Sequence, residues 1–242
     1  MRIPRIYTER PLEINREVEL GQSASRHLSK ALRLKEGAAI ILFNGEGGQY
    51  QATISSINKN SVRALLSEFF QADNESPLEI HLGICISRGE RMDHIIQKST
   101  ELGVSEITPL FGERTEVKLN SDRQQKKLDH WQQIAISACE QSGRNRIPLI
   151  NKIQKPEHWV NELEATTKLV LHHRNANTIK NLPASISVAL LVGPEGGLSD
   201  DEISNAEKSG CQSLALGPRV LRTETAPLAA IAMLQAYWGD MG

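Results

Sequence analysis

The feature that most constrains this fold is an alternation of strand-like and helix-like segments from Leu78 onward. Short apolar runs indicate strands at 78–87, 106–111, 168–172, 187–192 and 213–216. Helical spacing of apolar residues indicates helices at 92–102, 124–142, 200–209 and 226–238. Such alternation is typical of a parallel sheet joined by crossover helices. The sequence therefore predicts an α/β domain over residues 78–242.

The first seventy residues follow another pattern, which predicts a small β-barrel with one helix. Strands are expected at 39–43 and 49–54, because the glycine-rich residues 44–48 between them form a hairpin turn signal. Residues 25–34 have the apolar spacing of a helix. A polar segment that ends in Pro77 marks the boundary between the halves. We predict a barrel at 1–72, a linker at 73–77 and an α/β domain at 78–242.

The net charge of -1 excludes a uniformly basic nucleic-acid binder. Residues 1–35 nevertheless contain eight Arg and Lys against four Glu, which suits either contact with phosphate or a solvated basic face. Arg144, after the long helix, suits either a phosphate or a surface or dimer contact. RNA contacts are predicted at Arg2, Arg5, Arg10, Arg26, Arg33 and Arg144.

The three cysteines lie far apart in the sequence, so we expect neither a disulfide framework nor a metal site. The first residues contain no apolar signal region, and no apolar run is long enough for a membrane span. These features together predict a protein of the cytoplasm.

The strongest local signal is a strand that runs directly into a glycine-rich turn. Residues 188–192 are apolar, Gly193-Pro194-Glu195-Gly196-Gly197 follow, and Ser199 and Glu202 have capping-box spacing. Glycines at the carboxyl end of a parallel strand let a ligand approach the backbone closely. The segment matches neither the Walker nor the dinucleotide-binding pattern. It indicates a cofactor pocket or, alternatively, a tight strand-to-helix turn.

A second strand, glycine turn and helix start occupies residues 214–227 and includes Gly217-Pro218. Thr225 is placed to cap the following helix, and Pro227 suits its first turn. Two such turns after successive strands can converge on one ligand, which favours the pocket. Residues 228–238 are apolar on nearly every face, so this helix is buried all round or lies against another subunit. A homodimer is therefore expected.

Several segments together resemble the SPOUT superfamily of methyltransferases, and within it the 16S ribosomal RNA (uracil-N3)-methyltransferase family. Each segment alone is weak, but their order over nearly the whole chain is specific. They are Arg26-His27-Leu28 with Leu32-Arg33, Gln97-Lys98-Ser99-Thr100-Glu101-Leu102-Gly103-Val104, Glu140-Gln141-Ser142-Gly143-Arg144 and both glycine segments.

The resemblance implies a PUA-like RNA-binding barrel followed by an α/β domain with a trefoil knot. It implies a homodimer, formed through the C-terminal domain, that methylates one uridine of 16S rRNA in the small ribosomal subunit. The knot rests on the resemblance alone, since general topology rules make threaded chains rare. The implied cofactor is S-adenosyl-L-methionine, bound in the knot by Leu171, Gly193, Pro194, Glu195, Gly196, Gly197, Leu216, Gly217, Val220, Leu221, Arg222 and Thr223.

Methylation at uracil N3 requires loss of the N3 proton, so the site needs a base or a cation that stabilises the deprotonated uracil. Arg222 is the candidate cation, and its alternative role is a salt bridge with Glu224 or Glu195. No base is predicted, because Glu101 is expected only to complete a helix end or to pair with Arg114.

Three other functions stay open from the residues. Glycine turns do not name their ligand, so the cofactor could be another adenine-containing molecule. The chain could be a ribosome-assembly factor without catalysis. It could also be a ribose 2′-O-methyltransferase with the same knot, although the N-terminal barrel and the 140–144 segment favour the uracil family.

Overall fold

The computed structural model of the chain describes residues 3–59, 61–72, 74–172 and 177–242, so the predicted RNA contact Arg2 lies outside the described residues. The chain divides into two compact units. The N-terminal unit comprises Met1–Glu75 and Cys139–Ile147, and the C-terminal unit comprises Ser76–Ala138 and Pro148–Gly242. The predicted domain boundary at 73–77 stays a prediction. It did not include the grouping of residues 139–147 with the N-terminal unit.

The N-terminal unit is built on a five-stranded sheet. Its strands lie in the order β1 (Arg5–Tyr7), β3 (Ala39–Phe43), β4 (Gln49–Ile57), β5 (Val62–Phe70) and β2 (Glu17–Glu19). All neighbours are antiparallel except β1 and β3. Alternate side chains of these strands point into one core that includes Ile40, Leu42 and Leu66. The predicted strands at 39–43 and 49–54 and the PUA-like β architecture are confirmed.

The predicted helix at 25–34 has a different form. A short α-helix, α1 (Gln22–Arg26), continues into a π-helix, η1 (His27–Ala31), in which the Leu32 amide donates to the His27 carbonyl at 2.9 Å. The wider π turn rotates Leu32 away from Leu28. Leu28 is therefore fully buried, whereas Leu32 is 40% exposed.

The C-terminal unit contains a six-stranded sheet in which every pairing is parallel, as the strand–helix alternation predicted. The order is β11 (Gln212–Leu214), β9 (Thr167–Leu171), β10 (Ser187–Val192), β6 (Glu79–Cys85), β7 (Glu106–Leu110) and β8 (Leu149–Ile150).

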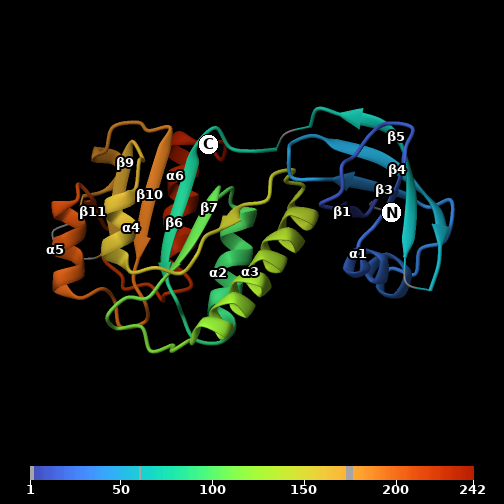
Figure 1. Cartoon of the computed structure of the whole chain (residues 1–242). Coiled ribbons are helices and arrows are strands. Elements are labelled where there is room, and N and C mark those ends of the chain that lie inside the picture. Colours follow the sequence, from blue (N-terminus) through green and yellow to red (C-terminus); the bar gives the residue numbers. More distant parts are fainter. Residues whose placement is uncertain (1–2, 60, 73, 173–176) are drawn as a thin grey trace. The chain divides into compact units, whose positions relative to one another are not determined.

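Helices cover both faces of this sheet. The helices are α2 (Glu90–Glu101), α3 (Ser121–Ser142), α4 (Pro156–Glu162), the 3-10 turn η2 (Ile179–Asn181), α5 (Asp200–Lys208) and α6 (Ala226–Trp238). Helices α4 and α5 pack together on one face, and α2 packs with α6, which lies behind the sheet in Figure 1. In the part of the chain that the structure describes, no helix is long and apolar enough to cross a membrane. The predicted knot is not tested by these contacts and stays a prediction.

A buried polar cluster lies where α4 packs on the sheet. His81 Nε2 accepts a hydrogen bond from Trp159 Nε1 at 3.1 Å and lies 2.7 Å from Thr108 Oγ1. Burial lowers the pKa of His81, and the nearby Glu106 carboxylate only partly opposes this effect. The imidazole is therefore neutral at pH 7, and its Nε2 is available as the acceptor for Trp159.

This cluster predicts a loss of stability in mild acid. A folded-state pKa below the unfolded value means that the unfolded chain binds the proton more tightly. The contribution of His81 is complete above about pH 6.5, the unfolded value, and falls as the pH falls below it. The free energy of unfolding is measured with urea from pH 7 to 5. We expect it to fall less steeply with falling pH for His81→Gln than for the wild type. Parallel slopes for the two proteins would contradict this.

Candidate functional site

Three neighbouring parallel strands bring the predicted cofactor segments to one edge of the sheet. Leu171, the last residue of β9, has Val192 of β10 and Leu214 of β11 as its register partners. Gly193 follows Val192 directly, and Gly217 follows Leu214 by three residues. The edge formed by the carboxyl ends of the strands is where open α/β sheets bind ligands. The structure thus places Leu171 between the starts of both segments.

The first glycine segment is a tight turn with little space inside it. A Cβ atom on Gly193 would lie 2.7 Å from the Leu198 nitrogen and 3.0 Å from the Gly197 carbonyl carbon. The Gly197 amide donates to the Pro194 carbonyl at 2.8 Å. The predicted capping box of Ser199 and Glu202 is confirmed at the start of α5.

The second glycine segment connects the edge strand β11 to a helix that packs beside α2. Helix α2 follows β6, so this connection leads from β11 toward the β6 side of the sheet. Gly217 has a φ of 106° in this segment. Pro227 lies in the first turn of α6 as predicted, but Thr225 forms no side-chain cap because its backbone is already helical. Leu216, Val220, Leu221 and Thr223 lie on this connection, and Val220 is 86% exposed.

Arg91 connects the two glycine segments. Its Nη1 donates to Glu195 Oε1 at 2.9 Å, and its Nε lies 3.9 Å from Glu224 Oε2. The Arg88 amide also donates to Glu195, at 3.1 Å. Partial burial alone would raise the pKa of Glu195, but these donors outweigh it and hold the pKa below its ordinary value. Glu195, a predicted cofactor contact, therefore serves first to fix the turn.

A further arginine holds the first glycine segment from the loop after β7. Arg114 Nη1 donates to the carbonyls of Gly196 at 3.0 Å and Leu198 at 3.2 Å. Of the two roles expected for Glu101, the helix end is confirmed, since α2 ends at Glu101, whereas the pair with Arg114 is replaced by an ion pair with Lys98 at 2.7 Å. Arg88, Arg91 and Arg114 were all missed as site residues. They could have been predicted from their positions shortly after two strands of the same parallel sheet, because the carboxyl ends of such strands share an edge.

Arg222, the predicted catalytic cation, lies on the surface of the second glycine segment. Its side chain is 81% exposed, and Nη1 is 3.9 Å from Glu224 Oε1. Of the two salt bridges expected as alternatives, the one with Glu224 is therefore present, with a long distance between the charged atoms. Glu224 lies between two cations, Arg222 and Arg91, and the Arg222 guanidinium faces solvent.

The predicted RNA contacts fall into two groups. Arg10, Arg26 and Arg33 are exposed on the N-terminal unit. Arg5 lies over the Phe43 ring at 5.0 Å, and its Nη2 donates to the Asn145 side chain at 2.6 Å. These three exposed cations are available to RNA, whereas Arg5 already binds protein groups.

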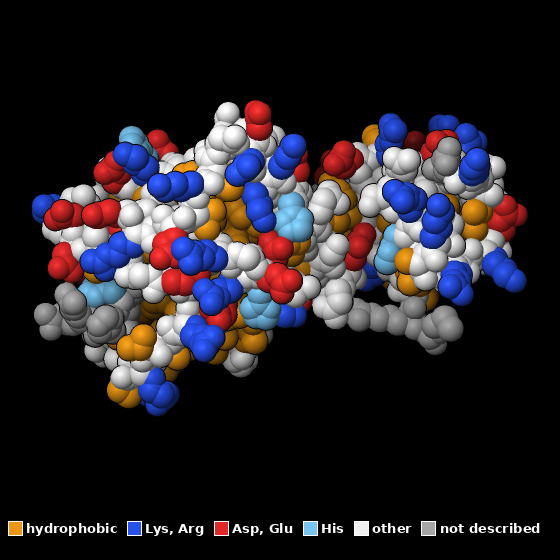
Figure 2. Space-filling view, turned by 90° about the horizontal axis from the view of Figure 1, so that it is seen from below, with side chains coloured by type: hydrophobic (Ala, Val, Ile, Leu, Met, Phe, Trp, Pro, Cys, Tyr) orange, Lys and Arg blue, Asp and Glu red, His pale blue; other side chains and the backbone are white. Residues whose placement is uncertain are grey.

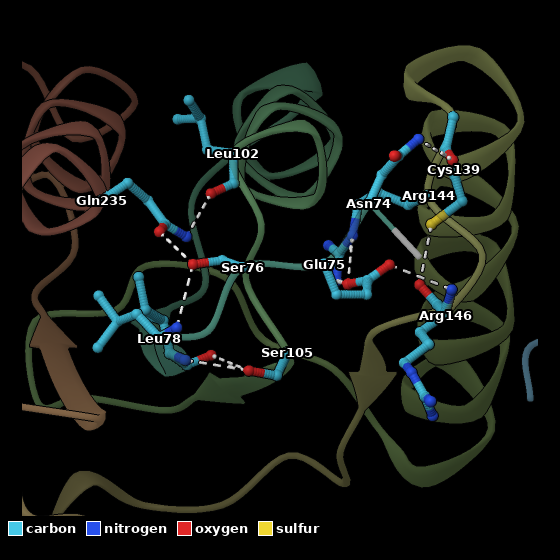
Figure 3. Close-up of polar contacts among 12 residues, drawn as sticks. Asn74, Glu75, Ser76, Leu78, Leu102, Ser105, Cys139, Arg144, Arg146 and Gln235 are labelled. Carbon is cyan, nitrogen blue, oxygen red and sulfur yellow. Dashed lines mark hydrogen bonds and ion pairs between the residues drawn. The ribbon is translucent and has the colours of Figure 1, made fainter. Parts of the chain in front are cut away.

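The 140–146 segment binds the rest of the N-terminal unit. Arg144 is buried, and its Nε donates to Glu75 Oε2 at 3.0 Å. Figure 3 shows the Glu75 carboxylate directed toward Arg144 and the backbone of Arg146. Glu140 accepts from the Tyr7 amide at 3.0 Å, and burial raises the pKa of Glu140. Arg144 thus holds this segment in place, and a contact with RNA stays a prediction.

A hollow of about 400 Å³ lies between α4, α5 and the residues that follow β7. Glu113, Glu157, Asp201 and Glu202 line it together with one cation, Lys155. Its lining contains none of the predicted cofactor residues, so the glycine segments at the sheet edge remain the candidate site. Among the described residues, no group of three or more His, Cys, Asp and Glu side chains could hold a metal ion.

Comparisons with known proteins identify relatives of the whole chain. A family model described as an RNA methyltransferase domain matches residues 74–235, and one described as an RNA methyltransferase PUA domain matches residues 20–67. Ribosomal RNA small subunit methyltransferase E of Buchnera aphidicola (from Schizaphis graminum) is 41% identical over 245 residues, 99% of this chain and 98% of that protein. The Bacillus subtilis protein of the same name is 30% identical and covers 86% of this chain and 85% of its own.

Two solved structures are similar to the chain over its full length. A methyltransferase of Legionella pneumophila in complex with the cofactor SAM has a TM-score of 0.96 and 42% identity, over 99% of this chain and 100% of that chain. A ribosomal RNA small subunit methyltransferase E of Neisseria gonorrhoeae bound to S-adenosyl methionine has a TM-score of 0.93 and 40% identity, over 100% of both chains.

Proposed function

This chain belongs to the RNA methyltransferase family. We propose that it transfers the methyl group of S-adenosylmethionine to N3 of one uridine in 16S rRNA of the small ribosomal subunit. The main support is that Leu171 lies between Val192 and Leu214, the strand residues that lead into the two glycine turns. The names of the relatives and the cofactor bound in two similar structures support it. Because its proposed substrate is a ribosomal subunit, the proposed compartment is the cytoplasm.

The residues at the sheet edge fit such a cofactor. Gly197 and Gly217 both have positive φ, and a Cβ atom built on either would meet nothing within 4 Å. Backbone in this conformation and next to open space lets a ligand approach the peptide groups closely. The backbone at Gly197 and Gly217 is therefore open to a ligand.

The chemistry divides between the cofactor and the chain. S-adenosylmethionine supplies an electrophilic methyl group on its sulfonium. The chain must place uracil N3 in line with that methyl and stabilise the negative charge that N3 deprotonation leaves on the ring. Arg222 is the proposed source of that stabilisation. Because N3 lies on the Watson–Crick edge, the uridine must be unpaired or displaced from its helix when it reacts.

Transfer of labelled methyl groups tests the proposal. The chain is incubated with methyl-labelled S-adenosylmethionine and small subunits from cells that lack this enzyme. We expect label in 16S rRNA and none with subunits from cells that contain the enzyme. Binding of such subunits without cofactor affinity would instead support an assembly factor, and a preference for ATP or a nicotinamide would overturn the cofactor assignment.

Arg91→Gln is predicted to weaken cofactor binding without unfolding the chain. The variant removes the cation between Glu195 and Glu224, so the two glycine segments lose a shared anchor. Because the ion pair between Arg91 and Glu195 is partly exposed, we expect only about a threefold to tenfold rise in the Kd for S-adenosylmethionine. Titration calorimetry measures it, with Lys98→Gln at the other end of α2 as the control. Arg91→Lys should recover part of the affinity, and an unchanged Kd for Arg91→Gln would remove Arg91 from the site.

We further propose that α6 forms a homodimer contact. On this helix Leu228, Ala232 and Met233 are only partly buried, and Tyr237 is 48% exposed. An apolar helix face with this much exposure is typical of a surface that another subunit covers. The predicted dimer through the C-terminal domain is thus supported by the helix that the sequence singled out.

Met233→Glu is therefore expected to give a monomer. A carboxylate at this position would have to be buried without a partner in the dimer, at a cost of several kcal/mol. Light scattering should give twice the 26.8 kDa chain mass for the wild type and a single chain mass for the variant. Lys208→Glu, an exposed change on α5, serves as the charge control. A monomeric wild type would contradict the proposed dimer.

A further inference from the structure

A small cationic pocket lies on the N-terminal unit between helix η1 and the turn that joins β4 to β5. Its volume is about 150 Å³. Its charged lining residues are Arg26 and Lys30 from the helical side and Lys59 from the turn, and its other lining residues are uncharged and polar. Pockets for cofactor-sized ligands run to about 300–1,000 Å³, so this one suits a single small group. Its charge selects an anion.

The three cations of the pocket differ from other cations of the same unit. Arg16 pairs with Glu13 at 3.6 Å, and Arg63 pairs with Glu19 at 3.1 Å. Within the described ranges, neither an ion pair nor a hydrogen bond engages the side chains of Arg26, Lys30 or Lys59. Their donors therefore face solvent and are available to a bound anion.

The backbone beneath the pocket is fixed by buried hydrogen bonds. Ser25 Oγ donates to the Leu20 carbonyl at 3.1 Å and accepts from the Val62 amide at 3.0 Å, which fastens α1 to β5. Ser29 Oγ donates to the Ser25 carbonyl at 2.7 Å. The π-helix that carries Lys30 is a rare element that frequently marks functional sites. The helical segment that carries Arg26 and Lys30 is therefore firmly anchored.

We propose that this pocket binds a phosphate group of the RNA backbone and so docks the substrate on the N-terminal unit, an inference that rests on the proposed function. Lysine and arginine contacts to phosphate fix the register of a nucleic acid on a protein without reading its sequence. Figure 2 shows lysine and arginine side chains across the surface of this unit on the side viewed. Of the RNA contacts predicted from sequence, Arg26 belongs to this pocket, and Lys30 and Lys59 are added to it.

Salt-dependent RNA binding tests the pocket. Fluorescence anisotropy with a labelled single-stranded RNA is measured from low to physiological salt for the wild type, for Arg26→Gln/Lys30→Gln and for a matched control, Arg16→Gln/Arg63→Gln. Each phosphate contact to a single strand contributes about 0.7 to the slope of log K against log salt. Because the pocket holds one phosphate, we expect the pocket pair to reduce this slope by up to about 0.7, and Lys59→Gln in addition to complete that loss.

The outcomes separate this inference from the proposed function. We expect the triple variant to bind RNA at least tenfold more weakly, while its Kd for S-adenosylmethionine and its thermal midpoint match the control. Equal RNA affinity for the pocket and control variants would overturn the inference. Stabilisation of the wild type by inorganic phosphate, combined with that equality, would assign the pocket to a free anion. Failure of the wild type to bind S-adenosylmethionine would instead overturn the proposed function.

Discussion

Replacing Arg222 with glutamine is expected to lower kcat for methyl transfer by about 100- to 1,000-fold, the usual effect of removing one charge-stabilising donor from an active site. The side chain is 81% exposed, and its one ion pair among the described residues is with Glu224 at 3.9 Å, so its loss should leave the fold intact. Because the charge on uracil develops as N3 loses its proton, the effect should fall on kcat. The Kd for S-adenosylmethionine should change by only a few-fold.

Single-turnover methylation of small subunits measures this effect. Arg219→Gln, an exposed arginine in the same segment, is the matched control and should react at the wild-type rate. If Arg222 stabilises deprotonated uracil, the variant should recover more of its rate than the wild type as the pH is raised. A wild-type rate for Arg222→Gln would remove Arg222 from the chemistry. A rise in the Kd alone would make it a cofactor ligand.

Gly193→Ala is expected to weaken S-adenosylmethionine binding by about 10- to 100-fold. The added methyl would lie 2.7 Å from the Leu198 nitrogen, so the backbone of the turn must move. Overpacking of this kind typically costs about 1–3 kcal/mol. Since the turn follows β10 directly, the movement displaces the peptide groups proposed to face the cofactor.

Titration calorimetry of Gly193→Ala measures the loss. Gly21→Ala is the control, because a Cβ atom on Gly21 would meet nothing within 4 Å and its φ is -59°. We expect the control to bind the cofactor as the wild type does. Wild-type affinity for Gly193→Ala would mean that the first glycine segment is only a tight turn, the alternative that its sequence left open.

The fold followed from the sequence where local patterns were strong. The alternation after Leu78 correctly gave a parallel sheet, because buried parallel strands form continuous apolar runs. Helix α4 and strand β8 were missed. Helix α4 has 7 residues and β8 has 2, too few for a clear periodicity. The π-helix was missed because its extra residue per turn depends on the burial of Leu28 in the sheet core.

The candidate site could be predicted from sequence only in part. The two glycine segments were visible because each is contiguous and follows an apolar strand. Arg91 and Arg114 come from other parts of the chain, and only the strand order brings them to the same edge. Arg144 looked like an open cation in the sequence, but its partner Glu75 lies far from it along the chain. Contacts of that range follow from the fold rather than from local pattern.

The identity of the methylated nucleoside decides whether this chain methylates uracil at N3. After reaction with S-adenosylmethionine and small subunits from cells that lack the enzyme, the 16S rRNA is digested to nucleosides and analysed by mass spectrometry. If the chain methylates uracil at N3, we expect 3-methyluridine in the wild-type reaction and almost none with Arg222→Gln. A 2′-O-methylated nucleoside, or no methylated nucleoside when a control methyltransferase modifies the same subunits, would contradict it.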